Sequence, residues 1–560
     1  MSLHVFSSLL KAALRLNNLN AFGKIPAMKS TRIVALAVLV AAAAPVAQNA
    51  PRYDLMIVGG RVLDGSGTPE RVVDIAIKDG RIVAIGSIAA ADAREVLDVR
   101  GLTVAPGFID VHTHADDVVE QPDAENFLRM GVTTIVAGNC GSSALDVGEA
   151  LTKIQQTGVS VNFATLIGHN TVRRAVMGTE DRRPTIPEMQ KMKSLVWRAM
   201  TDGAVGLSTG LQYVPGTYAR APELIELAQI AGNAGGVYAS HMRNEGTALE
   251  EAVAETIRIG EMTRARVQIS HLKVDSPSRW GASAKALEMI DKARAGGTIV
   301  QADQYAYTAA SSNLGIRFPA WVLEGGQEKI TERLNDAATW TRIKQEMAQL
   351  LADRGLEDLS FAVVASYRAD ASLNGLSMKQ VAAKLKGGET ADAQFEAARE
   401  MMLAGGASMV YHFMSDDDVQ RIMRHPQVGF ASDSGVLTPG RGVPHPRGYG
   451  NNARVLGEYV RERKVIPLAE AIRKMTSLPA EQFRFAGRGL IKEGFAADVV
   501  VFDPAKVSDP STFEKPHAYA TGMLHVLVNG VFVIRGGEPT HAKPGKPLTP
   551  DAAQSSVRAK

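Results

Sequence analysis

The chain has few of the features that mark disulfide-rich, membrane-spanning or nucleic-acid-binding proteins. It has one cysteine among 560 residues, so no disulfide can form within it. Its apolar run at 33–44 has 12 residues, whereas a membrane-spanning helix needs about 20. The formal net charge is only +3, and residues 1–50 contain five basic and no acidic residues. The remainder is therefore slightly acidic, and the charge implies no nucleic-acid partner.

The overall composition is that of an ordinary globular protein. Hydrophobic residues make up 45% of the chain and charged residues 22%. These proportions exclude a disordered chain, a coiled coil and a collagen-like fibre. The length fits either two to four domains or one barrel with additions.

The N-terminal region has the layout of an export signal. A basic stretch from Met28 to Arg32 precedes the apolar run, and small residues continue to Ala50. This order predicts an upstream segment, then a signal peptide from about Met28 to about Ala50. We therefore expect an exported, periplasmic protein with no stable membrane span after cleavage. An uncleaved N-terminal anchor is the alternative that this pattern leaves open.

Short β-rich runs at both ends of the chain predict one small β-sandwich. Residues 53–85 and 497–533 contain such runs, separated by Gly, Asp and Asn-Gly turns. We expect the sandwich to combine residues 51–105 with residues 489–540. The Pro-, Lys- and Ala-rich residues 541–560 are predicted to form a loose tail.

Between these ends, apolar strands alternate with helical stretches such as 221–234. This alternation over residues 106–488 predicts an α/β fold, a (β/α)8 TIM barrel. An insertion at 318–410, between the seventh and eighth strands, is expected to form a lid or substrate wall. The eight expected strands are 108–114, 133–137, 162–168, 204–208, 237–241, 267–271, 298–305 and 428–433.

Metal-binding residue types follow the first two expected strands. His112 and His114 are two residues apart at the end of the first strand, so both imidazoles can reach one ion. Asp110 precedes them and can orient a ligating histidine. Cys140 follows the second strand, and a thiolate is a strong zinc ligand that can bridge two metals. Alone, the histidine pair could be core residues and the cysteine an inert buried thiol.

The fifth, sixth and eighth strands end in a similar way. His241 and His271 each lie in a Ser-His-x-Arg/Lys pattern, 30 residues apart, which is about one βα unit. If the strands continue, Arg243 and Lys273 face the same way as these histidines and could bind a carboxylate. Asp433 follows the eighth strand and could serve as a general base or acid beside a metal-bound water. Together these residues are hard to explain by packing, because all fall at the same end of their strands.

With these motifs the sequence resembles the amidohydrolase superfamily, and within it the N-acyl-D-amino-acid deacylases, or D-aminoacylases. The resemblance extends from about Tyr53 to about Gly537. Many members bridge two metals with a carboxylated lysine on the fourth strand, but residues 204–210 contain no lysine. The D-aminoacylases depart in the same way and use a cysteine. The motifs that carry the resemblance are Gly107–His114, Gly138–Gly141, Gly206–Leu211, Ser240–Arg243, Ser270–Lys273, Ser432–Asp433 and His445–Arg447.

The resemblance implies a tight zinc site and a second, weaker one. Cys140, His241 and His271 would form the tight site, and His112 and His114 would share Cys140 in the second. The residues that it places near substrate are Lys273, Tyr305 and Arg447 at the carboxylate, and Tyr213 or His241 at the carbonyl oxygen. His169 also matches a family motif. It is a candidate for substrate binding, and a hydrogen-bonding role behind the site is the equal alternative.

The implied reaction is zinc-dependent hydrolysis of the amide bond of N-acyl-D-amino acids, with metal-bound hydroxide as nucleophile. Asp433 would accept the proton of the water and return it to the leaving amine. The preference for D-amino acids follows from the resemblance alone. Two alternatives remain: another amidase of this superfamily, acting on a cyclic amide, a dipeptide or a bulky N-acyl compound, and a non-catalytic binding protein. The sequence leaves the side-chain preference and the oligomeric state open.

Overall fold

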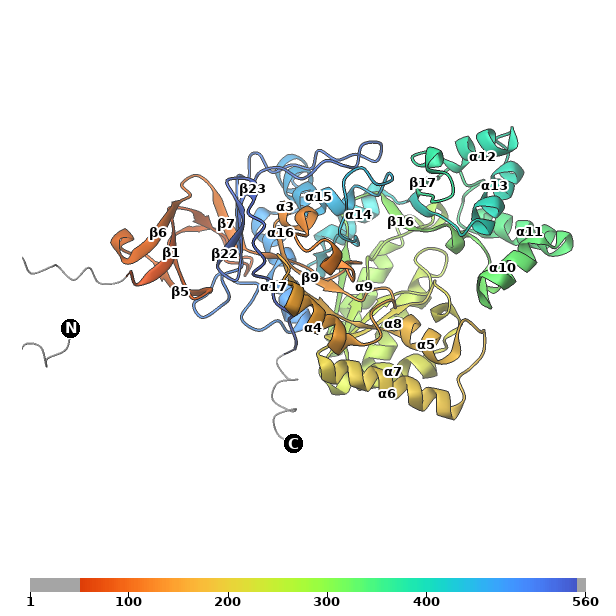
Figure 1. Ribbon diagram of the computed structural model, residues 1–560, viewed down its shortest axis with the longest axis horizontal. Coiled ribbons are helices and arrows are strands. Elements are labelled where there is room, and N and C mark those ends of the chain that lie inside the picture. The colour runs from red at the N-terminus through yellow and green to blue at the C-terminus, as the bar shows by residue number, and fades with distance from the viewer. Residues whose placement is uncertain (1–50, 551–560) are drawn as a thin grey trace, which may run out of the picture. The chain divides into compact units, whose positions relative to one another are not determined.

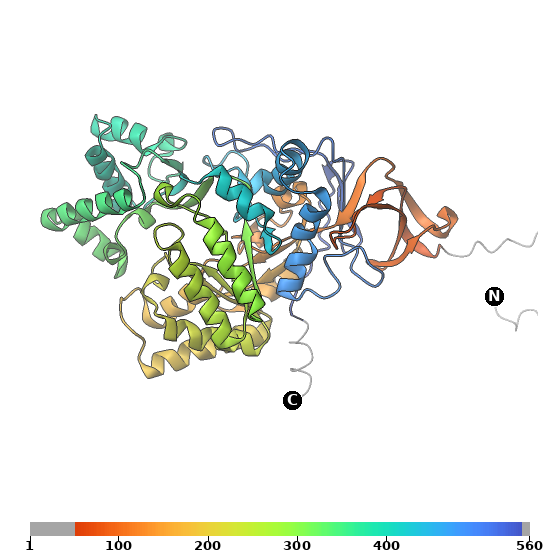
Figure 2. The same cartoon turned by 180° about the vertical axis from the view of Figure 1, so that it is seen from behind.

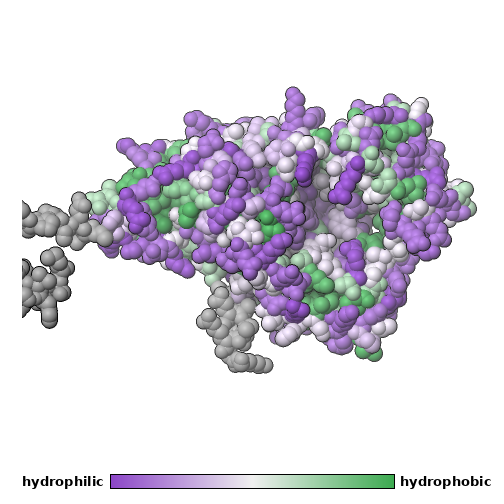
Figure 3. Space-filling view, in the orientation of Figure 1, coloured by the Kyte–Doolittle hydropathy of each residue, from purple (hydrophilic) through white to green (hydrophobic). Residues whose placement is uncertain are grey.

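The computed structural model describes residues 51–550, so the expected signal segment lies outside the described residues. Within this range, no helix has both the length and the apolar character that crossing a membrane requires. On the face drawn in Figure 3 hydrophilic residues predominate, and the hydrophobic ones form separate groups. Most large apolar side chains are instead gathered in interior cores.

Both ends of the described chain contribute to two β-sheets that share one apolar core. Their strands are β1 (Tyr53–Val58), β2 (Arg61–Val62), β3 (Arg71–Val72), β4 (Asp74–Lys78), β5 (Arg81–Gly86), β6 (Ala93–Asp98), β7 (Thr103–Pro106), β20 (Val499–Phe502), β21 (Met523–Val528), β22 (Val531–Arg535) and β23 (Glu538–Pro539). The sheet orders are β5-β4-β1-β6 and β23-β22-β21-β20-β7-β2-β3. The second sheet joins the two ends where β20 pairs with β7, blue beside orange in Figure 1. Ile57, Ile77, Val104 and Val501 fill the space between the sheets.

A second set of strands is parallel throughout. It comprises β8 (Phe108–Asp110), β9 (Val132–Ala137), β10 (Asn162–Thr165), β11 (Ile167–Gly168), β12 (Gly206–Gly210), β13 (Val237–His241), β14 (Arg266–Ile269), β15 (Val300–Gln304) and β19 (Val428–Phe430). Two sheets, β10-β9-β8 and β11-β12-β13-β14-β15-β19, contain them. Only Leu166 separates β10 from β11. The other edges of the two sheets are β8 and β19. Just beyond them, the His114 amide donates to the Ser434 carbonyl at 2.9 Å.

Helices alternate with these parallel strands and pack an apolar stripe against them. Their bounds are α3 (Glu125–Arg129), α4 (Val147–Thr157), α5 (His169–Met177), α6 (Ile186–Asp202), α7 (Ala221–Asn233), α8 (Leu249–Thr263), α9 (Ser283–Ala295), α14 (Asp416–Arg424), α15 (Arg447–Arg454), α16 (Leu468–Met475) and α17 (Ser477–Phe483). Helix α7 buries Leu224, Leu227, Ala228 and Ala231, which recur at helical spacing on one face. In Figure 2 the yellow-green helices α7 to α9 cover the strands from outside.

The segment between β15 and β19 forms an additional α+β layer, called the insertion below. It contains β16 (Ala309–Asn313), α10 (Gly326–Asn335), α11 (Ala337–Asp353), β17 (Ala362–Ser366), α12 (Met378–Lys386), α13 (Ala391–Leu403) and β18 (Ser408–His412). The three strands are antiparallel, in the order β16-β18-β17. The insertion therefore begins before residue 318, because Ala309 already pairs with His412. The sequence Ala-Ala-Ser-Ser-Asn of β16 has little intrinsic strand preference, so its partner β18 determines it.

The C-terminal segment differs from the loose tail that we expected. Gly545 donates its amide to the Val159 carbonyl at 2.8 Å, and Leu548 donates to Phe163 at 2.7 Å. Phe163 in turn donates to Lys546 at 3.0 Å. The segment is therefore held against the start of β10 as far as Leu548. For residues 545–548 the expectation was wrong, because composition reports polarity and not these backbone hydrogen bonds. Residues 551–560 lie outside the described residues.

Candidate metal centre and substrate cavity

Six predicted side chains meet at the carboxyl ends of the parallel strands. His112 and His114 follow β8, Cys140 follows β9, His271 follows β14 and Asp433 follows β19. His241 is the last residue of β13. All but His114 are buried. Strand ends of parallel α/β proteins converge on one face, which is where their active sites lie.

Three of these residues have a backbone conformation that non-glycine residues rarely adopt. The φ angles of Cys140, His271 and Asp433 are 51°, 36° and 50°. Hydrogen bonds hold two of these turns: the His271 amide donates to Asp303 Oδ1 at 2.8 Å, and the Asp433 amide donates to the His112 carbonyl at 2.9 Å. Such positive φ values outside glycine cluster at functional sites. The turns redirect the chain at the end of each strand, so the predicted strands 108–114 and 428–433 end early, at residues 110 and 430.

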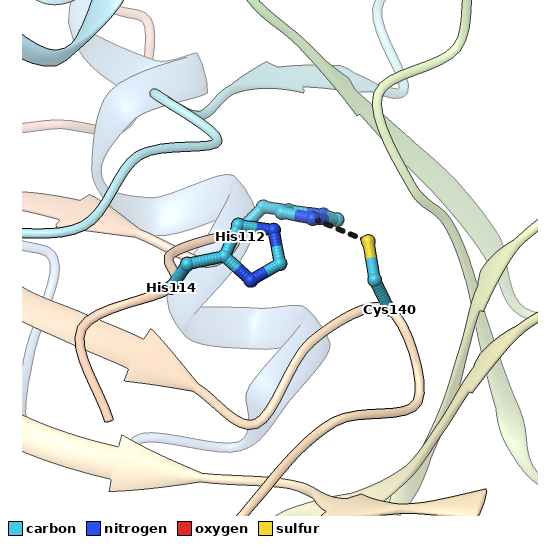
Figure 4. A group of neighbouring side chains, drawn as sticks. All are labelled: His112, His114 and Cys140. Atoms are coloured by element: carbon cyan, nitrogen blue, oxygen red, sulfur yellow. Dashed lines mark hydrogen bonds between the residues drawn. The ribbon is translucent and has the colours of Figure 1, made fainter. Parts of the chain in front are cut away.

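Cys140 lies at the centre of the cluster. Its Sγ is 3.3 Å from His112 Nε2, 3.6 Å from His241 Nδ1 and 3.6 Å from His271 Nε2. Figure 4 shows His112 and His114 on one loop, with the thiol of Cys140 directed at His112. Sulfur and nitrogen ligands of one tetrahedral zinc, bound at about 2.3 and 2.1 Å, lie about 3.6 Å apart. The donor set and the distances from sulfur to His241 and His271 therefore fit zinc.

The ligand atoms form three overlapping groups, and in each group all atoms lie within 4.8 Å of one another. Cys140, His112 and His271 each belong to two of them, so Cys140 is one of three side chains placed to be shared between two ions. The groups are His112, His114 and Cys140; Cys140, His241 and His271; and His112, His271 and Asp433.

Burial sets the protonation of these ligands. It lowers the pKa of His112, His241 and His271 well below the usual histidine value, so these imidazoles are neutral, which is the form that binds metal. Burial also raises the pKa of the Cys140 thiol well above its usual value. A thiolate at this position therefore needs a nearby cation, and a bound zinc ion provides that charge.

Asp433 is ionised although it is buried. Burial acts to raise its pKa, but the charge of the Arg447 guanidinium and the hydrogen bond with His114 outweigh that effect and hold the pKa well below its usual range. Arg447 Nη1 lies 2.9 Å from Asp433 Oδ2, and His114 Nε2 lies 3.1 Å from Oδ1. The carboxylate can therefore accept a proton beside the metal ligands.

Two buried carboxylates behind the ligands fix the backbone of the site. Asp110 accepts hydrogen bonds from the amides of His112, at 3.1 Å, and Ser432, at 3.0 Å. It thus ties the first strand end to the last. Asp303 accepts from the His271 amide and lies 3.6 Å from His112 Nδ1. Burial raises the pKa of both aspartates to about 7.

Glu245 is a further acidic residue, and we did not predict a role for it from the sequence. It is buried, and its Oε1 lies 2.9 Å from His271 Nδ1 and 2.6 Å from Lys273 Nζ. A hydrogen bond to the second ring nitrogen orients a ligating histidine and fixes its tautomer. Its position four residues after His241 was the available signal. Asp303, an acid inside the buried strand β15, gave a comparable one.

A cavity of about 700 Å³ opens beside the cluster and is also lined by four of the predicted substrate residues. Tyr305 lies between two of these, with its ring centre 4.5 Å from the Arg447 guanidinium carbon and 5.9 Å from Lys273 Nζ. The ring centre of Tyr213 lies 4.6 Å from that of His241, with the two rings tilted by 53°. Burial lowers the pKa of Lys273, but Glu245 and Tyr305 reverse this and leave it above the usual value, so the amine is charged.

The structure places Arg243 outside this cavity, contrary to the sequence prediction. Its Nε lies 3.0 Å from Glu255 Oε2, and its Nη1 donates to the Thr217 carbonyl at 3.0 Å. The prediction assumed that the strand continues past His241, but β13 ends there, so the two-residue alternation does not apply. Lys273 does face the cavity, because the turn at His271 redirects the chain.

His169 also lies behind the cavity wall. It is buried, and its Nε2 lies 2.8 Å from Glu223 Oε1. The next residue, Asn170, lines the cavity, and its amide donates to the Gly210 carbonyl at 3.0 Å. This position favours the hydrogen-bonding role behind the site, the alternative that the sequence left open for His169.

Known proteins with similar sequences are metal-dependent amide hydrolases. The sequence profile of the amidohydrolase family matches residues 95–534. The N-acyl-D-glutamate deacylase of Alcaligenes xylosoxydans xylosoxydans is 36% identical over 525 residues, which cover 90% of this chain and 98% of that protein. The D-aminoacylase of the same organism is 35% identical with the same coverage.

A solved structure is similar over the same extent. The N-acyl-D-glutamate deacylase of Bordetella bronchiseptica matches with a TM-score of 0.77 and 36% identity, covering 89% of this chain and all of that one. It contains zinc and a phosphonate inhibitor that mimics the tetrahedral intermediate of its reaction.

Proposed function

This chain belongs to the amidohydrolase family, and we propose that it hydrolyses the amide bond of N-acyl-D-amino acids in a zinc-dependent reaction. The observation that carries the proposal is the cluster of neutral imidazoles, thiol and ionised carboxylate at the strand ends. The names of the relatives supply the substrate class and its D configuration. The products would be a carboxylate and a free D-amino acid.

Cys140, His241 and His271 would hold the tight zinc ion, and His112 and His114 would share Cys140 at a second, weaker site. Zinc, when bound, acidifies water and polarises a carbonyl group. Asp433 is the base and then the acid of the reaction. It accepts a proton from the attacking water and returns it to the leaving nitrogen, which its ionised state allows.

The remaining cavity residues would orient the substrate. Lys273 and Arg447 are cations at one side of the cavity, with the Tyr305 ring between them, and together they suit the substrate α-carboxylate. Burial raises the pKa of Tyr305 to about 12 and that of Tyr213 well above its usual value. Both phenols therefore remain protonated, and Tyr213, whose ring contacts His241, can donate to the carbonyl oxygen.

The insertion wall suggests the class of side chain. Arg317 is 7% exposed, lines the cavity, and lies near the rings of Phe361, Tyr411 and Phe413 at 5.9, 4.5 and 5.7 Å. Its Nε has no hydrogen-bond partner within residues 51–550. Burial lowers its pKa, which reflects incomplete compensation of the charge.

A buried guanidinium is stabilised when an anion pairs with it. We therefore propose that Arg317 binds an acidic side chain of the substrate, as in N-acyl-D-glutamate. The aromatic rings around it would pack against the methylene groups of that side chain. This assignment agrees with the named substrate of the glutamate deacylase relatives.

Two further proposals concern the closure of the barrel and the export of the protein. We propose that the two parallel sheets form one closed (β/α)8 barrel, supported by the hydrogen bonds between the His114 and Ser434 region and by the shared β10 and β11 strand. We also propose that residues 28–50 direct export to the periplasm, which rests on the sequence pattern.

The experiment that tests the function measures amine release from N-acetyl-D-glutamate and N-acetyl-L-glutamate by zinc-loaded protein. We expect release from the D form alone. Release from neither form, with zinc confirmed bound, would overturn the substrate. Turnover of a hydantoin, a dihydropyrimidine or a dipeptide instead would establish another amidase of the family. Absence of both bound zinc and turnover would favour a binding protein.

A further inference from the structure

His445 lines the cavity but belongs to neither the metal ligands nor the proposed substrate contacts. Its side chain is buried in the loop between β19 and α15. Its Nδ1 accepts a hydrogen bond from the Arg447 amide at 3.0 Å, and its Nε2 donates to the Ala309 carbonyl at 2.9 Å. Because one nitrogen accepts and the other donates, the ring is neutral with its hydrogen on Nε2.

The two partners of His445 belong to different walls of the cavity. Arg447 is the first residue of α15, whereas Ala309 is the first residue of β16 in the insertion. Edge contacts with Tyr307 and Phe513, both at 5.1 Å, restrict the orientation of the ring. His445 therefore joins the insertion to the backbone of Arg447 through one rigid side chain.

The position of Arg447 depends on the hydrogen bond from its amide to His445 Nδ1. Its guanidinium lies over Tyr305 and close to Asp433, yet its Nη1 makes no well-directed hydrogen bond within the described residues. Nη1 lies 2.9 Å from Asp433 Oδ2, but a guanidinium has five N–H donors and can pair with a ligand carboxylate beside Asp433. A long side chain binds a carboxylate well only if its backbone is fixed, because a misplacement of about 1 Å can cost about 100-fold in rate.

We propose that His445 is a positioning residue, whose Nδ1 fixes the Arg447 backbone so that the guanidinium meets the substrate α-carboxylate. This role rests on the proposed function. In this role the acceptor nitrogen, Nδ1, contributes to substrate binding through Arg447. The donor nitrogen, Nε2, anchors the insertion at Ala309.

Two substitutions separate these hydrogen bonds. Asn in His445→Asn can place its oxygen near the position of Nδ1, but it is too short to reach Ala309. Gln in His445→Gln can place its NH₂ group near the position of Nε2, but it offers no acceptor to the Arg447 amide. Both remove the ring, so a merely structural role would change the two variants alike.

We expect His445→Gln to raise KM for N-acetyl-D-glutamate at least tenfold, with kcat within threefold of the wild type. His445→Asn should keep KM within threefold, although both variants should lose thermal stability and retain zinc. In an Arg447→Ala background, His445→Gln should leave KM unchanged, because the residue through which it acts is gone. The α-carboxamide of the substrate should likewise show no difference between His445→Gln and the wild type.

Equal KM values for the two single variants, or a tenfold rise that persists in the Arg447→Ala background, would overturn the role of His445. These outcomes leave the proposed function intact, since they require a wild-type enzyme that turns over the substrate. A wild type with bound zinc and no turnover would overturn the proposed function and the role of His445 with it.

Discussion

The strand-end side of the cavity and the insertion side are built in different ways. At the strand ends, six metal-competent or acidic side chains converge from parallel strands, and their ligand atoms lie within a few ångströms of one another. At the insertion, a single cation, Arg317, lies among three aromatic rings contributed by an antiparallel sheet and its flanking residues. We infer that the ends of the parallel strands supply the catalytic chemistry and that the insertion supplies the substrate selectivity. Substitutions on the two sides should therefore have separable effects.

The largest effect is expected at the strand ends. Asp433→Asn should lower kcat by about 10³-fold or more, because it removes the group that accepts and returns the proton. The side chain keeps its shape, so the zinc content should remain at the wild-type level. Turnover with a stopped assay and zinc by atomic emission would measure both. The exposed Asp392→Asn serves as a control, and near-normal turnover of Asp433→Asn would refute its assignment.

An intermediate and selective effect is expected at the insertion. Arg317→Met keeps the side-chain length but removes the charge, so kcat/KM for N-acetyl-D-glutamate should fall by about 100-fold, the cost of leaving a buried carboxylate unpaired. For N-acetyl-D-methionine, kcat/KM should stay the same or rise. Steady-state kinetics on the two substrates give the ratio. An equal loss on both would show that Arg317 only supports the fold.

The smallest effect is expected at Arg243, the one predicted substrate cation that lies outside the cavity. Arg243→Met should change KM less than threefold and lower the free energy of unfolding by about 1 kcal/mol, since the Arg243–Glu255 pair is partly exposed. Lys273→Met is the matched variant, because it removes a cation that lines the cavity, and it should raise KM by more than tenfold. Urea denaturation and KM measurements separate the two, and a large KM effect at Arg243 would contradict the structure.

The sequence predicted the strand-end side better than the insertion side, and the reason is physical. His112, Cys140, His271 and Asp433 each follow an apolar strand, and parallel strands bring such positions together without any knowledge of the loops. The direction of a side chain beyond the end of a strand is harder to predict, because it depends on the local φ and ψ angles. For this reason Lys273 faces the cavity and Arg243 does not.

Other residues of the site depend on contacts between distant parts of the chain. Arg317 is one arginine among the apolar residues 314–323, and only the pairing of β16 with β18 brings it beside Tyr411. The role of Glu245 depends on its contact with His271, which lies 26 residues away in the sequence. The strand β16 has no pattern of its own, so the start of the insertion could not be predicted.

The most direct test of the account is anomalous X-ray diffraction from crystals of the zinc-loaded protein, with data collected on both sides of the zinc edge. We predict a zinc peak bound by Cys140 Sγ, His241 Nδ1 and His271 Nε2, at about 2.0 to 2.3 Å from each. A weaker second peak beside His112 and His114 would agree with a bridging Cys140. An active protein whose crystals show no zinc among Cys140, His241 and His271 would contradict the account.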